Sequence, residues 1–547
     1  MRRFMLRALA LVTSLFAGIG AGGGVAEGSN IGAPVTLPTD SYRSHSGGLI
    51  TRNVYDYAPS VMADGRYRMW WCSQLSGGAV AGDDILYAES TSLGGPFTAP
   101  GGGQQVRVFD GTATGWDQHT CDPSVLRVDG TYYMYYGGSR DGSPELTQIG
   151  VATSTNGLQW RRLNQGRPII TPAFEVDRPN KYGAGQPSTV YLGGKFYLLF
   201  TDTTGRGALS NGAGQFAWRS ADPTFQSGVE VFTATGWQPK AAGNDRSFSV
   251  LNGFSVDWHY SDALQAFVVA SNGPNATGTV LEFLDRNDLR VHPYPNGLLP
   301  GTYTEGPGLV SKPDKHARVT PQGECGRVPI DVLQSTANEP PHTLGHFGFD
   351  LLTGRTCADL TNSQVATLFN GYGIHAPGLP ATFITGARRL QIQELGVYTA
   401  LTGNRVNVSS QTFHQIPYGA SLHARLPAVQ ATGKLPGYLL DDGNLWPVTD
   451  QRILTANGSP VTTISLQEYD SYPKGPALRH AWPSLPAAQP GVTGPSSSTG
   501  LVSHRSTRPF SSCSIRGRGI GVGAQIDLVR YGSTKKGTPR DAAMINE

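Results

Sequence analysis

The chain has 547 residues, of which 71 are Gly and 38 are Pro, and only 15% of them are charged. Glycine above its usual share of roughly 7%, together with abundant helix-breaking proline, excludes a long helical architecture. The 9% aromatic content excludes a disordered chain, and a formal net charge of +3 lacks the basic footprint of a nucleic-acid-binding protein. We therefore expect a turn-rich, all-β protein without a nucleic-acid partner.

The N-terminus has the pattern of a signal peptide over residues 1–26. The basic start MRRFMLR precedes an apolar run at 8–19, and small residues follow up to Ala26. A membrane anchor is the competing interpretation, but the apolar run is shorter than the roughly 20 residues that span a bilayer. We expect a secreted, extracellular or periplasmic monomer with no membrane partner after signal cleavage.

Export permits disulfide bonds between the five cysteines of the chain. The economical pairings by position are Cys72 with Cys121 and Cys325 with Cys357, which leaves Cys513 unpaired, although the sequence alone allows other pairings. No C-x-x-C or H-E-x-x-H spacing occurs, so we expect no structural metal site.

A repeat follows the signal sequence. Three segments share a Pro-Ser, a strand, a Gly turn and an aromatic strand: YAPSVMADGRYRMWWCS, CDPSVLRVDGTYYMYYGG and GQPSTVYLGGKFYLLFTD. Their prolines, Pro59, Pro123 and Pro187, are spaced by 64 residues each time. Alternating apolar and polar residues bounded by turn residues predict antiparallel hairpins. Weaker copies begin at Gly253 and at Glu305.

Five such sheets without intervening helices predict a five-bladed β-propeller over residues 40–357. A repetitive sandwich or a β-solenoid is the alternative. The first strand of each blade of a propeller lines the central axis, so the residues that precede these strands should meet at one mouth. Blade by blade, these residues are Asp56, Asp122, Gln186, either Asn252 or Asp257, and Glu305.

Three carboxylates at one mouth are suited to glycoside hydrolysis, which needs one carboxylic acid and one carboxylate base or nucleophile. A third carboxylate raises the pKa of the acid. The structural alternative is that each Asp is a turn-forming residue at the start of a strand.

From about residue 51 to residue 352, the DPSV strand start, the DG turns, the aromatic second strands and the EGP element resemble the five-bladed glycosidases of glycoside hydrolase family 43. These include arabinanases, arabinofuranosidases and xylosidases. The resemblance implies that Asp56 is the general base, that Asp122 tunes the pKa of the acid and orients the substrate, and that Glu305 is the general acid. The chain departs from the family where Ala58 precedes the first Pro and where Gln186 occupies the third blade.

The surroundings of the mouth supply further candidates. We expect Trp116, His119 and Tyr182 to bind substrate together with Gln186 and Asp257, because rings stack on sugar faces and polar groups bind hydroxyls. Asp257 is also a reserve base. The reserve acids are Asp117 and Glu175.

We expect no cofactor, with one exception that the family resemblance implies: an axial Ca²⁺, for which His259 and His316 are the candidate ligands. A buried His in a structural role is the alternative for both residues.

The pattern changes after Cys357. Residues 358–475 contain short β-like runs without a further Pro-Ser unit, and we expect them to close the last blade and to form a small β-rich appendage. Residues 483–547 are rich in Ser, Gly and Pro and then basic, which predicts a disordered tail.

Two functions follow from this sequence. The first is a secreted glycoside hydrolase that cleaves pentose-containing polysaccharide of the arabinan or xylan type with inversion, and whose partner is its carbohydrate substrate. The second is a propeller that binds carbohydrate without cleaving it, for which Gln186 in place of an acid is the observation.

Overall fold

The computed structural model describes residues 42–48, 56–74, 82–103, 105–140, 146–272, 278–300, 306–335 and 344–479. The predicted signal sequence, Cys513 and the predicted tail at 483–547 lie outside these residues. Within the described ranges, no helix is both long and apolar enough to cross a membrane.

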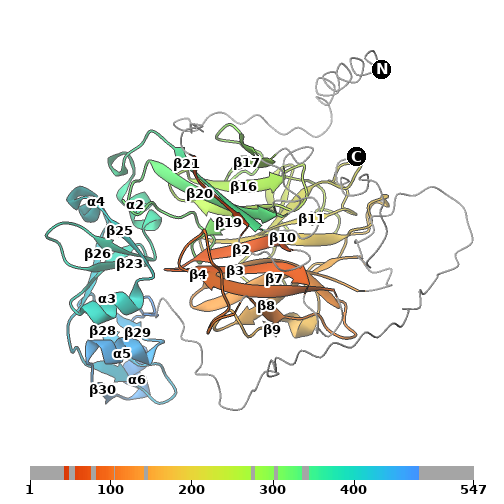
Figure 1. Ribbon diagram of the computed structural model, residues 1–547. Helices are drawn as coiled ribbons and strands as arrows, with labels where there is room; N and C mark the ends of the chain where they lie inside the picture. The colour runs from red at the N-terminus through yellow and green to blue at the C-terminus, as the bar shows by residue number, and fades with distance from the viewer. Residues whose placement is uncertain are drawn as a thin grey trace, which may run out of the picture.

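The predicted propeller is confirmed: antiparallel units, which we call blades, follow one another along the chain (Figure 1). The first strands contact one another in the order β2, β6, β10, β15, β19 and back to β2, so they form the inner ring. The first blade comprises β2 (Asp56–Ala63), β3 (Tyr67–Gln74), β4 (Asp83–Ser90) and β5 (Val106–Phe109). The second comprises β6 (His119–Val128), β7 (Thr131–Ser139), β8 (Gln148–Ser154) and β9 (Arg161–Arg162).

The third blade comprises β10 (Ala184–Leu192), β11 (Lys195–Asp202), β12 (Gln215–Ser220), β13 (Glu230–Thr233) and β14 (Gly236–Pro239). The fourth comprises β15 (Asp257–Ser261), β16 (Ala266–Asn272), β17 (Gly278–Asp285) and β18 (Gly297–Pro300). The fifth comprises β19 (Gly308–Ser311), β20 (Arg327–Ser335), β21 (Leu344–Leu352) and β1 (Tyr42–Gly48).

Tight turns join the first two strands of these blades. Asp129 and Gly130 connect β6 to β7 with φ values of 49° and 80°, and Gly193 and Gly194 connect β10 to β11 with 58° and 82°. Two consecutive left-handed residues match the twist of the flanking strands, and Gly and Asp adopt this conformation at low cost. The DG and GG signals in the sequence therefore mark real hairpins.

The Pro-Ser motif joins neighbouring blades. Each serine hydroxyl accepts a hydrogen bond from a backbone N–H of the next inner strand: Ser60 from Val125 at 2.9 Å, Ser124 from Thr189 at 2.9 Å and Ser188 from Trp258 at 3.2 Å. Between the fifth and the first blade, parallel pairing of β19 with β2 takes the place of this side-chain bond. The repeated serine is thus explained by packing between blades rather than by chemistry.

The prediction that residues 358–475 close the last blade is wrong. The N-terminal strand β1 pairs antiparallel with β21 and supplies the outermost strand of the fifth blade. The edge of β21 needs one antiparallel partner, and β1 lies before the first Pro-Ser unit, where no repeat signal marks it. Both expected disulfides are present, Cys72–Cys121 and Cys325–Cys357.

Residues 358–479 form a mixed α/β module rather than a purely β-rich appendage, and it lies beside the propeller (Figure 1). After the short 3-10 helix η4 (Cys357–Asp359) and α2 (Asn362–Leu368), its strands build two sheets with the orders β25-β22-β23-β24-β26 and β29-β28-β27-β30. Asn404 Nδ2 donates to the carbonyl oxygen of Ala63 at 3.0 Å, and the backbone N–H of Val319 donates to the Tyr372 hydroxyl at 2.9 Å. These bonds attach the module to the first and fifth blades.

The module contains an internal repeat in which equivalent residues are 56 positions apart. The first copy has β22 (Tyr372–His375), β23 (Thr382–Thr385), β24 (Arg388–Ile392), α3 (Leu395–Leu401), β25 (Asn404–Asn407), α4 (Ser410–Gln415) and β26 (Tyr418–Leu422). The second has β27 (Ala428–Gln430), β28 (Gly437–Leu439), β29 (Leu445–Pro447), α5 (Gln451–Asn457), β30 (Val461–Thr463) and α6 (Leu466–Ser471). The helices show the spacing most clearly: α5 begins and ends 56 residues after α3, and α6 begins and ends 56 residues after α4.

The same interactions recur in both copies. Ser409 and Ser465 cap α4 and α6, each accepting a hydrogen bond from the backbone N–H three residues later. The backbone N–H of Arg389 donates to the carbonyl oxygen of Pro417 at 2.8 Å, and that of Leu445 donates to Pro473 at 2.8 Å. The second half of the module therefore repeats the fold of the first.

Candidate active site

The five inner strands bring equivalent residues to one small cavity of about 20 Å³ on the propeller axis. One residue per blade lines it in a left-handed conformation: Ala58 (φ 47°), Asp122 (50°), Gln186 (52°), Ser255 (51°) and Gly306 (63°). In four blades a Pro follows. Backbone strain repeated at one position around the ring is of the kind that accumulates at functional sites.

The cavity brings together only part of the predicted set. Asp122, Gln186 and Asp257 line it, as expected. In the first blade the lining residue is Ala58 rather than Asp56, which lies two positions earlier on β2. Glu305 lies outside the described residues, and Gly306, which follows it, lines the cavity.

Asp122 is positioned by β6 at the cavity wall and is 8% exposed. Its Oδ2 accepts a hydrogen bond from the Tyr182 hydroxyl at 3.1 Å. Tyr182 stands on the connection that precedes β10, so two blades cooperate in orienting this carboxyl group. Tyr182 thus contacts the carboxyl group at the cavity, and its contact with substrate stays a prediction.

Asp56 has a different environment. Its residue is fully buried, and its Oδ1 accepts a hydrogen bond from Trp71 Nε1 at 2.8 Å. Asp56 pairs across the first blade with Ser73 of β3. These contacts hold its side chain within the blade, one step away from the cavity lining.

Gln186 links the third blade to the fourth. Its Oε1 accepts hydrogen bonds from Thr201 Oγ1 at 2.9 Å and from the backbone N–H of Ser255 at 2.8 Å. Both donors would serve a carboxylate oxygen equally well.

Asp257 occupies the place in the fourth blade that serine occupies in the first three. Its Oδ1 accepts from Ser188 Oγ at 2.5 Å and from Lys315 Nζ at 2.6 Å, and its Oδ2 accepts from Lys315 at 2.8 Å and from the backbone N–H of Leu309 at 2.8 Å. Lys315 is 1% exposed. A carboxylate bound to an ammonium group and two further donors is an ion pair, so Asp257 is poorly suited to act as a base.

Lys315 reaches the axis from a turn that crosses the inner strands. The carbonyl oxygens of Pro313, Asp314 and Lys315 accept hydrogen bonds from the backbone N–H groups of one inner strand each: Arg127 at 2.6 Å, Tyr191 at 3.1 Å and Tyr260 at 3.0 Å. The turn therefore covers the far ends of β6, β10 and β15, and its lysine points to the cavity-lining Asp257.

The residues present do not fit an axial Ca²⁺. His316 uses both ring nitrogens, Nδ1 with Asp262 Oδ2 and Nε2 with the carbonyl oxygen of Tyr191, each at 2.9 Å. His259 Nδ1 lies 3.2 Å from Ser311 Oγ. Burial, reinforced by the charge of Lys315, holds the pKa of His259 well below its usual value, so this ring is neutral beside an ammonium group. Ca²⁺ requires oxygen ligands, and the carboxylate oxygens of Asp257 at the axis are already bound to Lys315.

A charged cluster surrounds these histidines. Burial opposes the positive charge of His316, but Asp314 and Asp262 outweigh it and raise the pKa of His316. Burial likewise opposes the negative charge of Asp262, and the pKa of Asp262 is nevertheless lowered by His316 and Lys312. Both histidines thus have structural partners.

The remaining mouth candidates are held in packing or ion pairs. Trp116 Nε1 donates to the carbonyl oxygen of Gly166 at 2.8 Å and its ring stacks on Tyr136, so it fills space beside the second blade. Asp117 pairs with Arg162 at 2.7 Å, and Glu175 pairs with Arg206 at 3.0 Å. These two reserve acids are therefore engaged by arginines.

His119 begins β6 and is half-buried. It packs against Gly82, where a Cβ atom would lie 2.2 Å from His119 Nδ1. This close packing positions the ring between the first and second blades, and no carbohydrate contact follows from it.

Sequence reasoning missed Lys315 and the lining role of Ala58 and Ser255. A signal for the latter was available, because Ala58 and Ser255 align with Asp122 and Gln186 once the Pro-Ser register is read strictly. No local signal marks Lys315, since its partner Asp257 is 58 residues away.

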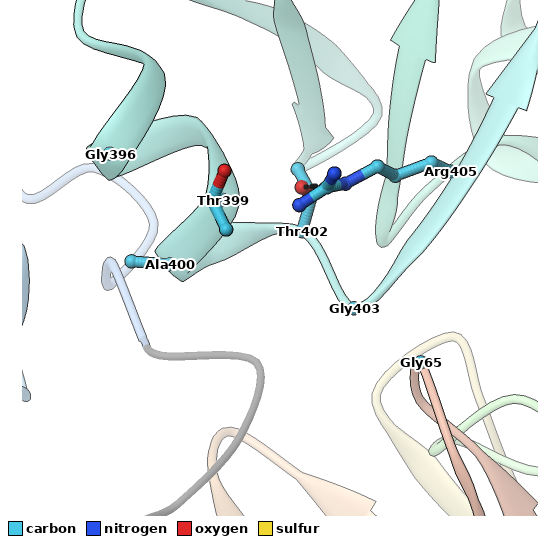
Figure 2. Close-up of a pocket in the computed structure, with 7 residues that line it drawn as sticks. All are labelled: Gly65, Gly396, Thr399, Ala400, Thr402, Gly403 and Arg405. Carbon is cyan, nitrogen blue, oxygen red and sulfur yellow. Dashed lines mark hydrogen bonds between the residues drawn. The ribbon is translucent and has the colours of Figure 1, made fainter. Parts of the chain in front are cut away.

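A second cavity, of about 520 Å³, lies between the module and the turn of the first blade (Figure 2). Its lining residues are Gly65, Gly396, Thr399, Ala400, Thr402, Gly403 and Arg405. Arg405 Nε donates to Thr402 Oγ1 at 3.0 Å. No carboxylate belongs to this lining.

Known proteins resemble part of the chain. It is 31% identical over 124 residues to an arabinan endo-1,5-alpha-L-arabinosidase A of Aspergillus niger, covering 22% of this chain and 35% of that protein. It is 30% identical over 153 residues to the enzyme of the same name from Aspergillus aculeatus, covering 27% and 41%. The chain thus matches well under half the length of these relatives. No family model matches it.

Solved structures with a similar arrangement include the alpha-L-arabinofuranosidase PaAbf62A from Podospora anserina, with a TM-score of 0.37, 11% identity, and coverage of 59% of this chain and 100% of that one. Another is the catalytic domain of a family 62 alpha-L-arabinofuranosidase from Coprinopsis cinerea, with a TM-score of 0.36, 14% identity, and coverage of 57% and 98%. By partial sequence likeness, this chain is similar to the glycosidases of the family 43 type.

Proposed function

We propose that this protein is an exported glycoside hydrolase that cleaves pentose-containing polysaccharide of the arabinan or xylan type. The observation that carries the proposal is Asp122, a carboxylate oriented by Tyr182 at the axial cavity on which all five inner strands converge. The likeness to the two Aspergillus arabinan endo-1,5-alpha-L-arabinosidases supports the choice of substrate.

The cavity itself has room for about one water molecule, so a sugar ring would bind above it, at the mouth. Asp122 would then contact the substrate from below. Glycoside hydrolysis needs a second carboxyl group on the other side of the scissile bond. We propose Glu305 as the general acid, on the resemblance of its EGP element to the family and on the position of Gly306 at the cavity.

Two residues are candidates for the general base, Asp56 and Asp122. The resemblance assigns this role to Asp56, whose side chain is buried against Trp71. Activation of water requires the base to lie within hydrogen-bond reach of it, directly or through one further water. Asp122 meets this condition more readily, because it lines the cavity.

The test is hydrolysis of arabinan, of xylan and of aryl pentosides by four proteins: the wild type, Asp56→Asn, Asp122→Asn and Glu305→Gln. The expected result is a loss of at least about 100-fold in kcat for Asp122→Asn and Glu305→Gln, the usual range for a positioned acid or base. A smaller loss for Asp56→Asn would assign it to packing. The proposal would be overturned if the wild type hydrolyses these substrates and both Asp122→Asn and Glu305→Gln hydrolyse them at the wild-type rate.

One observation favours a second candidate, carbohydrate binding without cleavage. Four of the five equivalent positions carry no carboxylate: Ala58, Gln186, Ser255 and Gly306. Binding of arabino-oligosaccharides by a wild-type protein that shows no hydrolysis would favour this function. In that case Gln186→Glu, which preserves shape and keeps both hydrogen-bond donors occupied, is the variant to examine for gained activity.

A further inference from the structure

Phe174 is presented to solvent in a conformation that bulky residues avoid. It lies in the connection between η2 (Asn164–Gly166) and β10, its residue is 67% exposed, and its φ is 53°. Among the described residues of the propeller, two other large hydrophobic side chains are exposed: Val106, at 38%, and Leu209, at 44%. Leu209 lies on the loop that follows β11. An L-residue other than Gly pays roughly 1–2 kcal/mol in the left-handed region.

The backbone around Phe174 is fixed to the third blade. The N–H of Ala173 donates to Asp202 Oδ2 at 3.0 Å, and the N–H of Phe174 donates to Thr204 Oγ1 at 2.9 Å. The next two N–H groups, of Glu175 and residue 176, both donate to the carbonyl oxygen of Thr204, at 3.2 and 3.0 Å. Four consecutive donors are satisfied, so the exposed ring stands on a rigid support.

The support is itself anchored by buried charges. Asp202 is fully buried and pairs with Arg246 at 2.9 Å. Arg178 donates to the carbonyl oxygens of Thr203, Gly205 and Ala208 at 2.8 to 3.0 Å. This network fixes the loop end of β11, where Phe174 is attached. The strain at Phe174 is therefore held in place by its surroundings, as is typical of functional positions.

Phe174 also lies on the mouth side of the propeller. The connection that carries it continues to Tyr182, which donates to Asp122, and then enters β10. Its anchor Thr204 follows the end of β11, and β11 runs antiparallel to β10, so both lie at the end of the blade where the axial cavity opens. The ring belongs to the same face as the candidate site.

We propose that Phe174 is a stacking platform, on the face of the axial cavity, for a sugar ring of a polymeric substrate. The proposal rests on the proposed function for its substrate class. An aromatic face binds the apolar C–H face of a sugar, and an uncharged pentose chain offers such faces repeatedly. A pre-oriented ring loses little conformational freedom on binding, which is the advantage gained from the strained support.

Binding tests this role independently of cleavage. Affinity for soluble arabinan and for xylan is measured by gel retardation and by titration with the corresponding oligosaccharides, for wild type, Phe174→Ala and Phe174→Tyr. We expect Phe174→Ala to bind about 3- to 10-fold more weakly, the effect of losing one aromatic contact, and Phe174→Tyr to bind as the wild type does. Leu209→Ala is the matched control, an exposed apolar residue that should leave binding and activity unchanged.

Thermal unfolding separates binding from structure. An exposed ring contributes little to packing, so Phe174→Ala should keep the wild-type midpoint, and Phe174→Gly should unfold at the same or a higher temperature because it relieves the left-handed strain. Equal affinity of Phe174→Ala and wild type, or a wild type that binds neither polysaccharide, overturns the inference. A wild type that binds the polysaccharides through Phe174 but does not hydrolyse them would overturn the proposed hydrolase and still support this platform.

Discussion

Replacing Lys315 by Met tests the ion pair at the propeller axis. Both residues of the pair are buried, Lys315 at 1% and Asp257 at 7% exposure, and the ammonium nitrogen lies 2.6 and 2.8 Å from the two carboxylate oxygens. Met has a similar length and volume, so Lys315→Met leaves the packing nearly unchanged and removes the charge. Asp257 would keep its bonds from Ser188 and from the N–H of Leu309.

The geometry sets the size of the effect. Two unit charges about 2.7 Å apart attract by roughly 6 kcal/mol at an effective dielectric constant of about 20. The two remaining donors recover part of this, and removing one partner of a buried pair costs about 3–5 kcal/mol. We therefore expect Lys315→Met to lower the free energy of unfolding by about 3–5 kcal/mol.

The assay is urea unfolding at pH 7, followed by tryptophan fluorescence, on wild type, Lys315→Met, Asp257→Asn and the double variant. The double variant removes both charges and should lose only about 1–2 kcal/mol, the value of the weakened hydrogen bonds. Lys434→Met is the matched control, since Lys434 forms an exposed pair with Asp470 at 3.0 Å and should cost less than about 1 kcal/mol.

A Lys315→Met protein within about 1 kcal/mol of the wild type, or losses that simply add in the double variant, would refute the reasoning.

Three further outcomes are expected. Burial raises the pKa of Asp84 to about 7, and a neighbouring carboxylate adds to the shift. The unfolded chain releases this proton near pH 4, so the free energy of unfolding should fall as the pH rises from about 4 to 7. Asp84→Asn should flatten that decline in scanning calorimetry. Gly308→Ala should cost at least about 2 kcal/mol in urea unfolding, since its Cβ would lie 1.7 Å from the carbonyl oxygen of Pro59. Replacing Cys72 and Cys121 by Ser should cost about 2–5 kcal/mol, measured in the same way.

The propeller could be predicted because its signals are local. The 64-residue spacing of Pro59, Pro123 and Pro187, the hairpin turns and the alternation of each strand all lie within single blades. The outermost strand of the fifth blade could not be predicted, because its pairing with β21 joins segments about 300 residues apart in the chain. Both disulfides were predictable since each joins cysteines close in the chain.

The repeat in the C-terminal module escaped sequence reasoning for a different reason. Its copies share few identical residues, and their common features are a capping serine, a Pro and a Gly at fixed spacing: Ser409 and Ser465, Pro417 and Pro473, Gly419 and Gly475. Each of these residues fixes a chain turn or a helix start rather than a core contact. Most core positions carry different apolar residues in the two copies. The repeat is therefore recognised from the boundaries of its helices and strands rather than from residue identity.

In each blade, the position of the serine and the position before the proline have different roles. This difference decides which carboxylates are candidates for acid or base chemistry. The serine position accepts a backbone N–H from the next blade, and Asp257 does the same for Leu309 in the fourth blade. A carboxylate there brings a charge that Ser188 does not, and Lys315 neutralises it. The position before the proline lines the cavity, and its residue varies between blades. A carboxyl group at that position, as at Asp122, lines the cavity and is the candidate for contact with a substrate.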